Sequence, residues 1–224
     1  MYPPGGPKEF IRGNPVNPRD TIIYNRITEL GAYYGELMHV LKHLLCIICI
    51  SVLNSHLIAF DADALDLLVK TGECKDCDLR EIDFSNKELN RIFISNGDLS
   101  KSLFLQTLFA DSTFEKVQFA KCDLSFAQFI SSNLKEVIFK ESGMNNTDFT
   151  DSILEKSVIK ESNIIGAIFR NTTIRFCEFT ECDLEGADFR GADLTGTGFY
   201  KCNLHGVLTD KSTVGPDGES GWFP

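Results

Sequence analysis

The chain has 224 residues, of which 43% are hydrophobic and 11% aromatic, and its formal net charge is -10. This composition is sufficient for a real hydrophobic core and excludes a disordered chain. The excess of acids makes phosphate backbones poor partners, because nucleic-acid binding draws most of its affinity from cationic side chains.

Residues 38–64 contain the three parts of a secretory signal in the expected order. A short basic start at Met38 is followed by an apolar run over residues 44–53 and by an Ala-x-Ala motif at residues 62–64. The run is shorter than the roughly 20 apolar residues that a comfortable membrane span needs. We therefore expect a signal peptide, and the alternative is an uncleaved membrane anchor formed by residues 41–60.

Residues 1–37 fit neither interpretation, because a stretch rich in Pro and Gly precedes a modest helical pattern. One hypothesis is that Met38 is the biological start and that these residues are an upstream extension of the reading frame. The leader also contains four soft metal-binding side chains, which a helix would place roughly on one side: His39, His43, Cys46 and Cys49. An apolar signal segment that contains such residues is the better explanation, and no metal site is predicted.

Residues 65–76 are expected to cap the N-terminal end of the domain that follows. The stretch from Ala62 to Thr71 predicts a short helix, which Gly72 ends. The apolar positions of this helix are Leu65, Leu68 and Val69.

Residues 77–206 repeat with a period of five. Stepping by five from Leu79 meets an apolar residue at every position as far as Leu204, and the residue two places earlier is mostly small, with Lys87 as the one clear violation. A helix would scatter such positions around its axis, and a straight strand would send them alternately to opposite faces. Period five gathers one apolar side only if the chain turns a corner in every repeat. We therefore expect an all-β solenoid.

The columns of the repeat indicate how many sides each coil has. Every twentieth residue gives an unbroken aromatic ladder, whereas steps of fifteen mix Phe, Leu and Ile. One column of corner residues is rich in Gly and Asn, as positive φ in a type II turn requires, and the next is entirely charged. Twenty residues per coil predict four sides, and crossover connections are right-handed. The expected fold is a right-handed quadrilateral parallel β-helix. The ladder consists of Phe109, Phe129, Phe149, Phe169 and Phe189.

This register resembles that of the pentapeptide-repeat family. The A(D/N)Lxx consensus of that family appears nearly verbatim in GADFRGADL, residues 186–194, and loosely over the rest of the solenoid. The resemblance implies the same quadrilateral β-helix. The approach LLVKTGECKDCDL, residues 67–79, is similar to the lead-in of exported cyanobacterial members, which implies a periplasm or a thylakoid lumen.

Two pairs of cysteines are candidates for pairing. Cys74 and Cys77 form a CxxC, for which a disulfide and free thiols are equally favoured if the protein is exported. A redox-catalytic role is not favoured, because no thioredoxin-like pattern surrounds them. Cys182 and Cys202 share an inward column one coil apart, where they are interpreted as small core residues, since stacked parallel Cβ vectors are poor geometry for a disulfide.

The solenoid sequence lacks the motifs of common enzymes, among them a His-centred triad, a P-loop, a Gly-rich dinucleotide turn and HExxH. We predict no enzyme and no cofactor. One outward column of acids, Glu141, Glu161 and Glu181, would attract a cation or a basic partner. Lys140 and Lys160 lie beside it, however, and favour an edge whose charges compensate one another.

Outward apolar residues predict a contact surface. Ile138 and Val158 stack on one face, Ile153 lies on the neighbouring face, and Phe176 lies at the corner between them. Such clusters are more often contact surfaces than apolar residues exposed by chance. We expect a protein partner or self-association there.

Residues 207–224 are expected to form a C-terminal cap or tail. The open end of a solenoid needs covering, and the candidates for its lid are Trp222 and Phe223.

The predicted function is that of a non-enzymatic, exported scaffold or protein-protein interaction module with an unknown partner. Nucleic acid is not expected, and a membrane would be contacted only through the N-terminal apolar segment if it stays uncleaved. The alternative is an acidic DNA mimic that acts on a DNA-binding protein such as a type II topoisomerase, like the gyrase-protecting members of the family. The export leader, the absence of loops between coils and the absence of an amphipathic helix after Gly206 count against it.

Overall fold

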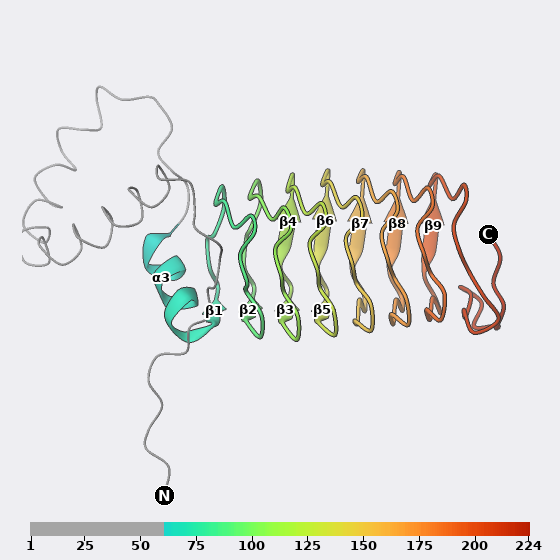
Figure 1. Cartoon of the computed structure of the whole chain (residues 1–224), viewed down its shortest axis with the longest axis horizontal. Helices are drawn as coiled ribbons and strands as arrows, with labels where there is room; N and C mark the ends of the chain where they lie inside the picture. Colours follow the sequence, from blue (N-terminus) through green and yellow to red (C-terminus); the bar gives the residue numbers. More distant parts are fainter. Residues whose placement is uncertain (1–60) are drawn as a thin grey trace, which may run out of the picture. The chain divides into compact units, whose positions relative to one another are not determined.

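The structure, a computed structural model, describes residues 61–224. Figure 1 shows one short helix followed by a row of stacked coils. Helix α3 spans Ala62–Thr71. The strands are β1 Glu73–Lys75, β2 Phe93–Ser95, β3 Thr113–Glu115, β4 Gln118–Ala120, β5 Asn133–Lys135, β6 Ile138–Lys140, β7 Val158–Lys160, β8 Glu178–Thr180 and β9 Gly198–Tyr200.

Several predictions concern residues 1–60 and lie outside the described residues. They are the extension of residues 1–37, the start at Met38, the anchor of residues 41–60, the soft side chains His39, His43, Cys46 and Cys49, and most of the signal peptide. The Ala-x-Ala motif of that signal, residues 62–64, is described and forms the first turn of α3. Between residues 61 and 224, no helix has the length and apolar character that crossing a membrane requires.

All strands pair in parallel with partners twenty residues away, for example Phe93 with Thr113 and Ile138 with Val158. One sheet has the order β1-β2-β3-β5, and a second has the order β4-β6-β7-β8-β9. Two further rows of bridges, such as Asp83 with Leu103 and Glu88 with Leu108, complete each coil. The predicted four-sided parallel β-solenoid is therefore confirmed. Parallel pairing begins at Glu73 and continues to Val214, which also forms an antiparallel bridge with Ser220, so the rows of pairs extend beyond residues 77–206 at both ends.

Each coil has four faces, which we number by the outward residues at their centres. Face 1 carries Glu73, Phe93, Thr113, Asn133, Ile153, Thr173 and Asp193, and face 2 carries Asp78, Asp98, Gln118, Ile138, Val158, Glu178 and Gly198. Face 3 carries Asp83, Leu103, Asp123, Gly143, Asn163, Asp183 and Asn203, and face 4 carries Glu88, Leu108, Gln128, Asp148, Ile168, Asp188 and Leu208. The corners are named by the two faces that they join.

Stacked phenylalanine rings fill the interior. Phe109 and Phe129 lie with ring centroids 4.8 Å apart, and Phe149 and Phe169 lie 5.0 Å apart with an interplanar angle of 2°. These distances match the spacing of about 4.8 Å between paired strands. The predicted aromatic ladder is thus confirmed, and all five of its rings are at most 2% exposed.

The small inward residues do more than fill space. The buried hydroxyl of Ser132 donates to the carbonyl of Phe109 at 2.6 Å and accepts from the backbone N–H of Ser112 at 3.1 Å. Ser142 makes the same pair of bonds, to the carbonyl of Phe119 and from the N–H of Cys122. Because buried backbone groups need partners, these hydroxyls join consecutive coils in places that the strand ladder leaves open.

Each corner turns through a residue with positive φ. The expectation for the Gly- and Asn-rich column is correct, with Asn86 at φ 60° and Gly186 at φ 67°. It was incomplete, however, because the charged column adopts the same conformation, as Lys101 at φ 63° shows. The left-handed region costs a non-glycine residue about 1 kcal/mol. Bonds between coils offset this cost, such as that from the N–H of Lys101 to the carbonyl of Ala120 at 2.7 Å.

Helix α3 closes the N-terminal end of the coils. Asp61 caps it by accepting from the N–H of Asp63 at 2.9 Å, and Gly72 at φ 75° ends it, as the sequence predicts. Leu68 is 2% exposed and joins the core. The strand β1 follows directly and already pairs with β2, so residues 73–75 belong to face 1.

The C-terminal end is covered by Trp222 but not by Phe223. The indole stacks on Phe199 with centroids 5.5 Å apart, whereas Phe223 is 74% exposed. The expectation for Phe223 is wrong, because one aromatic ring already covers the last phenylalanine of this column.

Candidate interaction surfaces

The four outward apolar residues selected from the sequence lie around one corner. Ile138 and Val158 are register partners on face 2, and Ile153 is on face 1. Phe176 is 62% exposed at the 1–2 corner, and Ile138 and Ile153 are each 40% exposed, while Val158 is partly covered. We call these four residues the 1–2 cluster.

The ring of Phe176 lies over the backbone of Gly196 in the following coil. A Cβ at Gly196 would come within 2.6 Å of Cδ1 of that ring, so this close approach requires glycine. The most exposed ring of the 1–2 cluster therefore packs in a defined position against the next coil.

The acidic column at the 2–3 corner is closely paired with lysines. Glu141 has Lys140 at 3.2 Å and Lys121 at 3.4 Å, and Glu181 has Lys201 at 2.8 Å. The hydrogen bond from Lys140 is the main cause that lowers the pKa of Glu141. Glu161 has Lys160 at 3.6 Å. This corner carries little uncompensated negative charge.

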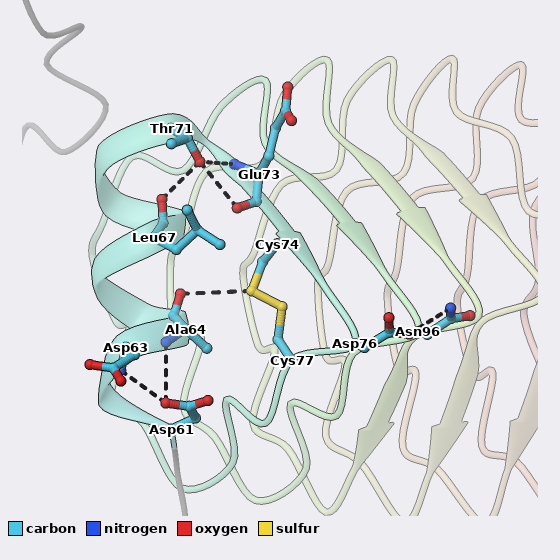
Figure 2. The surroundings of a disulfide bond; sticks show 10 residues. All are labelled: Asp61, Asp63, Ala64, Leu67, Thr71, Glu73, Cys74, Asp76, Cys77 and Asn96. Atoms are coloured by element: carbon cyan, nitrogen blue, oxygen red, sulfur yellow. Dashed lines mark hydrogen bonds between the residues drawn. A yellow bond between two sulfur atoms is a disulfide. The ribbon is translucent and has the colours of Figure 1, made fainter.

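Cys74 and Cys77 are joined by a disulfide, with Cα atoms 6.0 Å apart. Figure 2 shows it beside α3, where the sulfur of Cys74 lies 3.7 Å from the carbonyl oxygen of Ala64. Both cysteines are at most 5% exposed. A solvent-borne substrate has no direct path to this pair.

The remaining described cysteines are free and behave as core residues. The thiols of Cys182 and Cys202 donate to the carbonyls of Ile159 and Phe179 at 3.3 and 3.4 Å, as the serines of these columns do. Burial raises the pKa of Cys122 to about 12, which keeps this thiol protonated.

One charged group that sequence reasoning missed is the carboxylate of Asp188 on face 4. Its side chain is 7% exposed and lies 2.6 Å from Arg170 and 2.7 Å from Arg190. Burial alone would raise the pKa of Asp188, but hydrogen bonds from Arg190 and Arg170 lower it to about 2. The sequence does show two arginines twenty residues apart near an outward acid, but it does not show that both side chains bend toward that acid.

The sites that residues 61–224 offer are outward apolar and charged surfaces. Among residues 61–224, no three His, Cys, Asp or Glu side chains gather in a way that could hold a metal ion. A shallow depression at the 1–2 corner is lined by charged residues of both signs, Glu115, Lys116, Lys135 and Glu136.

Residues 132–208 match the family model described as pentapeptide repeat region. The chain contains a pentapeptide repeat region. The match covers the coils from β5 to the last bridge on face 4. No curated protein matches the chain.

Three solved structures of pentapeptide-repeat or related proteins are similar to this chain in fold. QnrB1, a plasmid-mediated fluoroquinolone resistance protein, is 19% identical with a TM-score of 0.40, over 66% of this chain and 79% of that one. Rfr23 from the cyanobacterium Cyanothece 51142 is 19% identical with a TM-score of 0.27, over 68% and 97%. A pentapeptide repeat protein from the Arabidopsis thaliana thylakoid lumen is 20% identical with a TM-score of 0.18, over 62% and 66%. At these identities the likeness concerns the fold alone.

Proposed function

We propose that this pentapeptide-repeat solenoid is a non-enzymatic scaffold that binds a protein partner, or a second copy of itself, through the 1–2 cluster. The observation that carries the proposal is the concentration of Ile138, Ile153 and Phe176 around one corner, each at least 40% exposed. Covering apolar surface gains about 25 cal/mol for each Å² removed from water. Exposed apolar clusters of this kind are typical of contact surfaces.

The backbone beneath the cluster is suited to a scaffold. The N–H of Lys156 bonds to the carbonyl of Arg175 at 3.0 Å, and the N–H of Phe176 bonds to that of Thr195 at 3.0 Å. Each corner is thus tied to the next coil, and a partner would meet a preorganised surface. Preorganisation reduces the entropy lost on binding.

The test is a double variant of the full chain, Ile138→Asp plus Val158→Asp. We expect it to abolish capture of the partner from a lysate of the source cells and any self-association seen by sedimentation. Gln118→Asp, on the same face but outside the cluster, is the matched control. Unchanged association of the double variant, with a circular dichroism spectrum like that of the parent, would refute the proposal.

We also propose that the protein is exported to a periplasm or a thylakoid lumen. The signal-like residues 38–64 and the buried disulfide support this, because disulfides persist in oxidising compartments. Cell fractionation with N-terminal sequencing tests it. A cytoplasmic pool with an intact Met1 would contradict export.

The acidic DNA mimic is the second candidate, and the net charge of -10 favours it. Six cations interrupt the 2–3 corner, however, and a duplex has no such cations. They are Arg80, Lys101, Lys121, Lys140, Lys160 and Lys201. Protection of a type II topoisomerase from DNA by the full chain would revive this candidate.

A further inference from the structure

A second outward apolar cluster lies along the 3–4 corner, which face 3 separates from the cations of the 2–3 corner. Leu103 on face 3 is 46% exposed, Leu105 at the corner is 38% exposed, and Phe126 in the next coil is 50% exposed. Leu108 on face 4 is partly exposed, and Ile165 is 37% exposed further along the same corner. We call these five residues the 3–4 edge.

Carboxylates flank the leucines of this edge. Leu103 is bridged to Asp83 in the preceding coil and to Asp123 in the following one. Leu108 is bridged in the same way to Glu88 on one side. Each leucine therefore lies next to an acid on the same face, about one strand spacing away.

Within the described part of the chain, these acids form no ion pair. Among residues 61–224, no Lys or Arg nitrogen lies within 4.0 Å of the carboxylates of Asp83, Glu88 or Asp123. Asp83 and Asp123 accept hydrogen bonds from the backbone N–H groups of Ser85 and Ser125, at 2.9 and 3.0 Å. They differ in this respect from the acids of the 2–3 corner.

The corner itself also lacks Lys and Arg. Its residue pairs are Ser85–Asn86, Leu105–Gln106, Ser125–Phe126, Asn145–Asn146, Ile165–Gly166, Glu185–Gly186 and His205–Gly206. The nearest cation in the repeat is Lys87, which occupies an inward position and is partly buried. Arg170 and Arg190, beyond face 4, are both held by Asp188.

We propose that the 3–4 edge binds a basic amphipathic segment of a protein partner, in which a Lys or Arg recurs at every third residue and is followed by a large apolar residue. This inference rests on the proposed scaffold function and names the chemistry of a partner. The apolar side chains of the segment cover Leu103, Leu105 and Phe126, while its cations pair with Asp83 and Asp123. These two carboxylates belong to coils two apart, or about 10 Å. One turn of a polyproline II segment has three residues and rises about 9 Å, so cations three residues apart lie on the same side of such a segment at about this distance.

Charge selects this occupant over the others. A second copy would bring an equally acidic edge against the first, and like charges across an interface disfavour binding. Nucleic acid is disfavoured for the same reason. An uncharged apolar segment would cover the leucines but leave the carboxylates without partners, so a basic segment satisfies both features.

The test uses fluorescence anisotropy of the full chain with three short labelled peptides. One consists of Lys-Leu-Ser repeats, one of Lys-Ser-Ser repeats and one of Glu-Leu-Ser repeats. We expect the first to bind, the second to bind about tenfold more weakly, and the third not to bind. Equal binding of the two basic peptides would overturn the proposal, because the apolar residues would then contribute nothing. No binding of the first peptide would overturn it as well.

Two variants of the chain locate the site. The first variant, Phe126→Asn plus Leu103→Thr, removes apolar surface, and asparagine is chosen because it tolerates the positive φ of this position. The second variant, Asp83→Asn plus Asp123→Asn, removes negative charge. Each is expected to weaken binding of the Lys-Leu-Ser peptide about tenfold. Glu141→Gln plus Glu181→Gln is the matched control, which removes the same charge from the 2–3 corner. If this control weakens binding equally, attraction is unspecific and the proposal fails.

The two proposals fail separately. Ile138→Asp plus Val158→Asp is expected to leave peptide binding unchanged, since the 1–2 cluster lies on other faces. Loss of peptide binding in that variant would contradict the proposal for the 3–4 edge. Retained partner capture in the same variant would contradict only the proposal for the 1–2 cluster.

Discussion

Trp222 lies nearly parallel to Phe199, with ring centroids 5.5 Å apart and planes 15° from each other. The same indole meets Phe189 edge-on at 6.4 Å. The single tryptophan of the chain is therefore the last layer of the aromatic interior. Without it, two phenylalanines would face water at the end of the solenoid.

Trp222→Ala is expected to lower the free energy of unfolding by about 2 kcal/mol, because it uncovers this end but deletes a side chain that is only partly buried. Urea unfolding followed by circular dichroism measures the change. Phe223→Ala is the control and should change stability by less than about 0.5 kcal/mol. Equal effects of the two substitutions would show that Trp222 is not the cover.

Ser132→Ala tests the hydroxyl bonds between coils. It leaves the carbonyl of Phe109 and the N–H of Ser112 without their side-chain partner in a buried position. We expect a loss of about 1–3 kcal/mol in the free energy of unfolding. The control is Ser125→Ala at the 3–4 corner, with an expected change below about 0.5 kcal/mol. A neutral Ser132→Ala would mean that small size alone matters at these positions.

The pKa of Asp188 predicts a loss of stability in acid. In the folded state the two arginines lower it to about 2, from an ordinary value of 3.8. A lowered folded-state pKa gives stability that is fully present above about pH 4 and is lost as the pH falls toward 2. The expected contribution is about 2 kcal/mol.

Asp188→Asn should therefore lower stability at neutral pH and flatten the acid limb of the stability curve, as urea midpoints across this pH range would show. Asp148→Asn, on the same face and without an ion pair among residues 61–224, is the control. If both variants keep the parental acid limb, the ion pairs of Asp188 with Arg170 and Arg190 do not contribute to stability.

Reduction of the disulfide between Cys74 and Cys77 is expected to lower the free energy of unfolding by about 2 kcal/mol. The loss is at the low end for a disulfide, because this one closes a loop of only a few residues. The loss should appear first in the hydrogen exchange of α3, which packs beside the pair. A Cys74→Ser plus Cys77→Ser variant should reproduce it without reductant. Exchange that changes in β9 rather than in α3 would contradict this expectation.

The repeat allowed the solenoid to be predicted because every pentad meets the same local environment. The inward position of Phe109 follows from its neighbours two and five residues away, without knowledge of the rest of the chain. The number of sides followed from columns, since residues twenty apart become physical neighbours. For the same reason, the placement of Ile138 beside Val158 could be read from the sequence.

Features that depend on how a side chain bends could not be read in this way. Two arginines converge on Asp188 only because both side chains fold back from one corner onto face 4. Hydrogen bonds of Ser132 depend on the direction of its hydroxyl, which the size of the residue does not reveal. The acids beside Leu103 form no ion pair within residues 61–224, and this becomes distinctive only when the ion pairs of the other corners are known.

The twenty-residue register limits how such a chain can change in length. Duplication or loss of one whole coil shifts everything beyond it along the axis and keeps each column continuous, because neighbouring coils interact mainly with each other. Insertion of a single pentad would instead rotate all later residues by a quarter turn and place the corner of Leu105 under a different row of side chains. Binding surfaces that span several coils can therefore be lengthened only in complete windings.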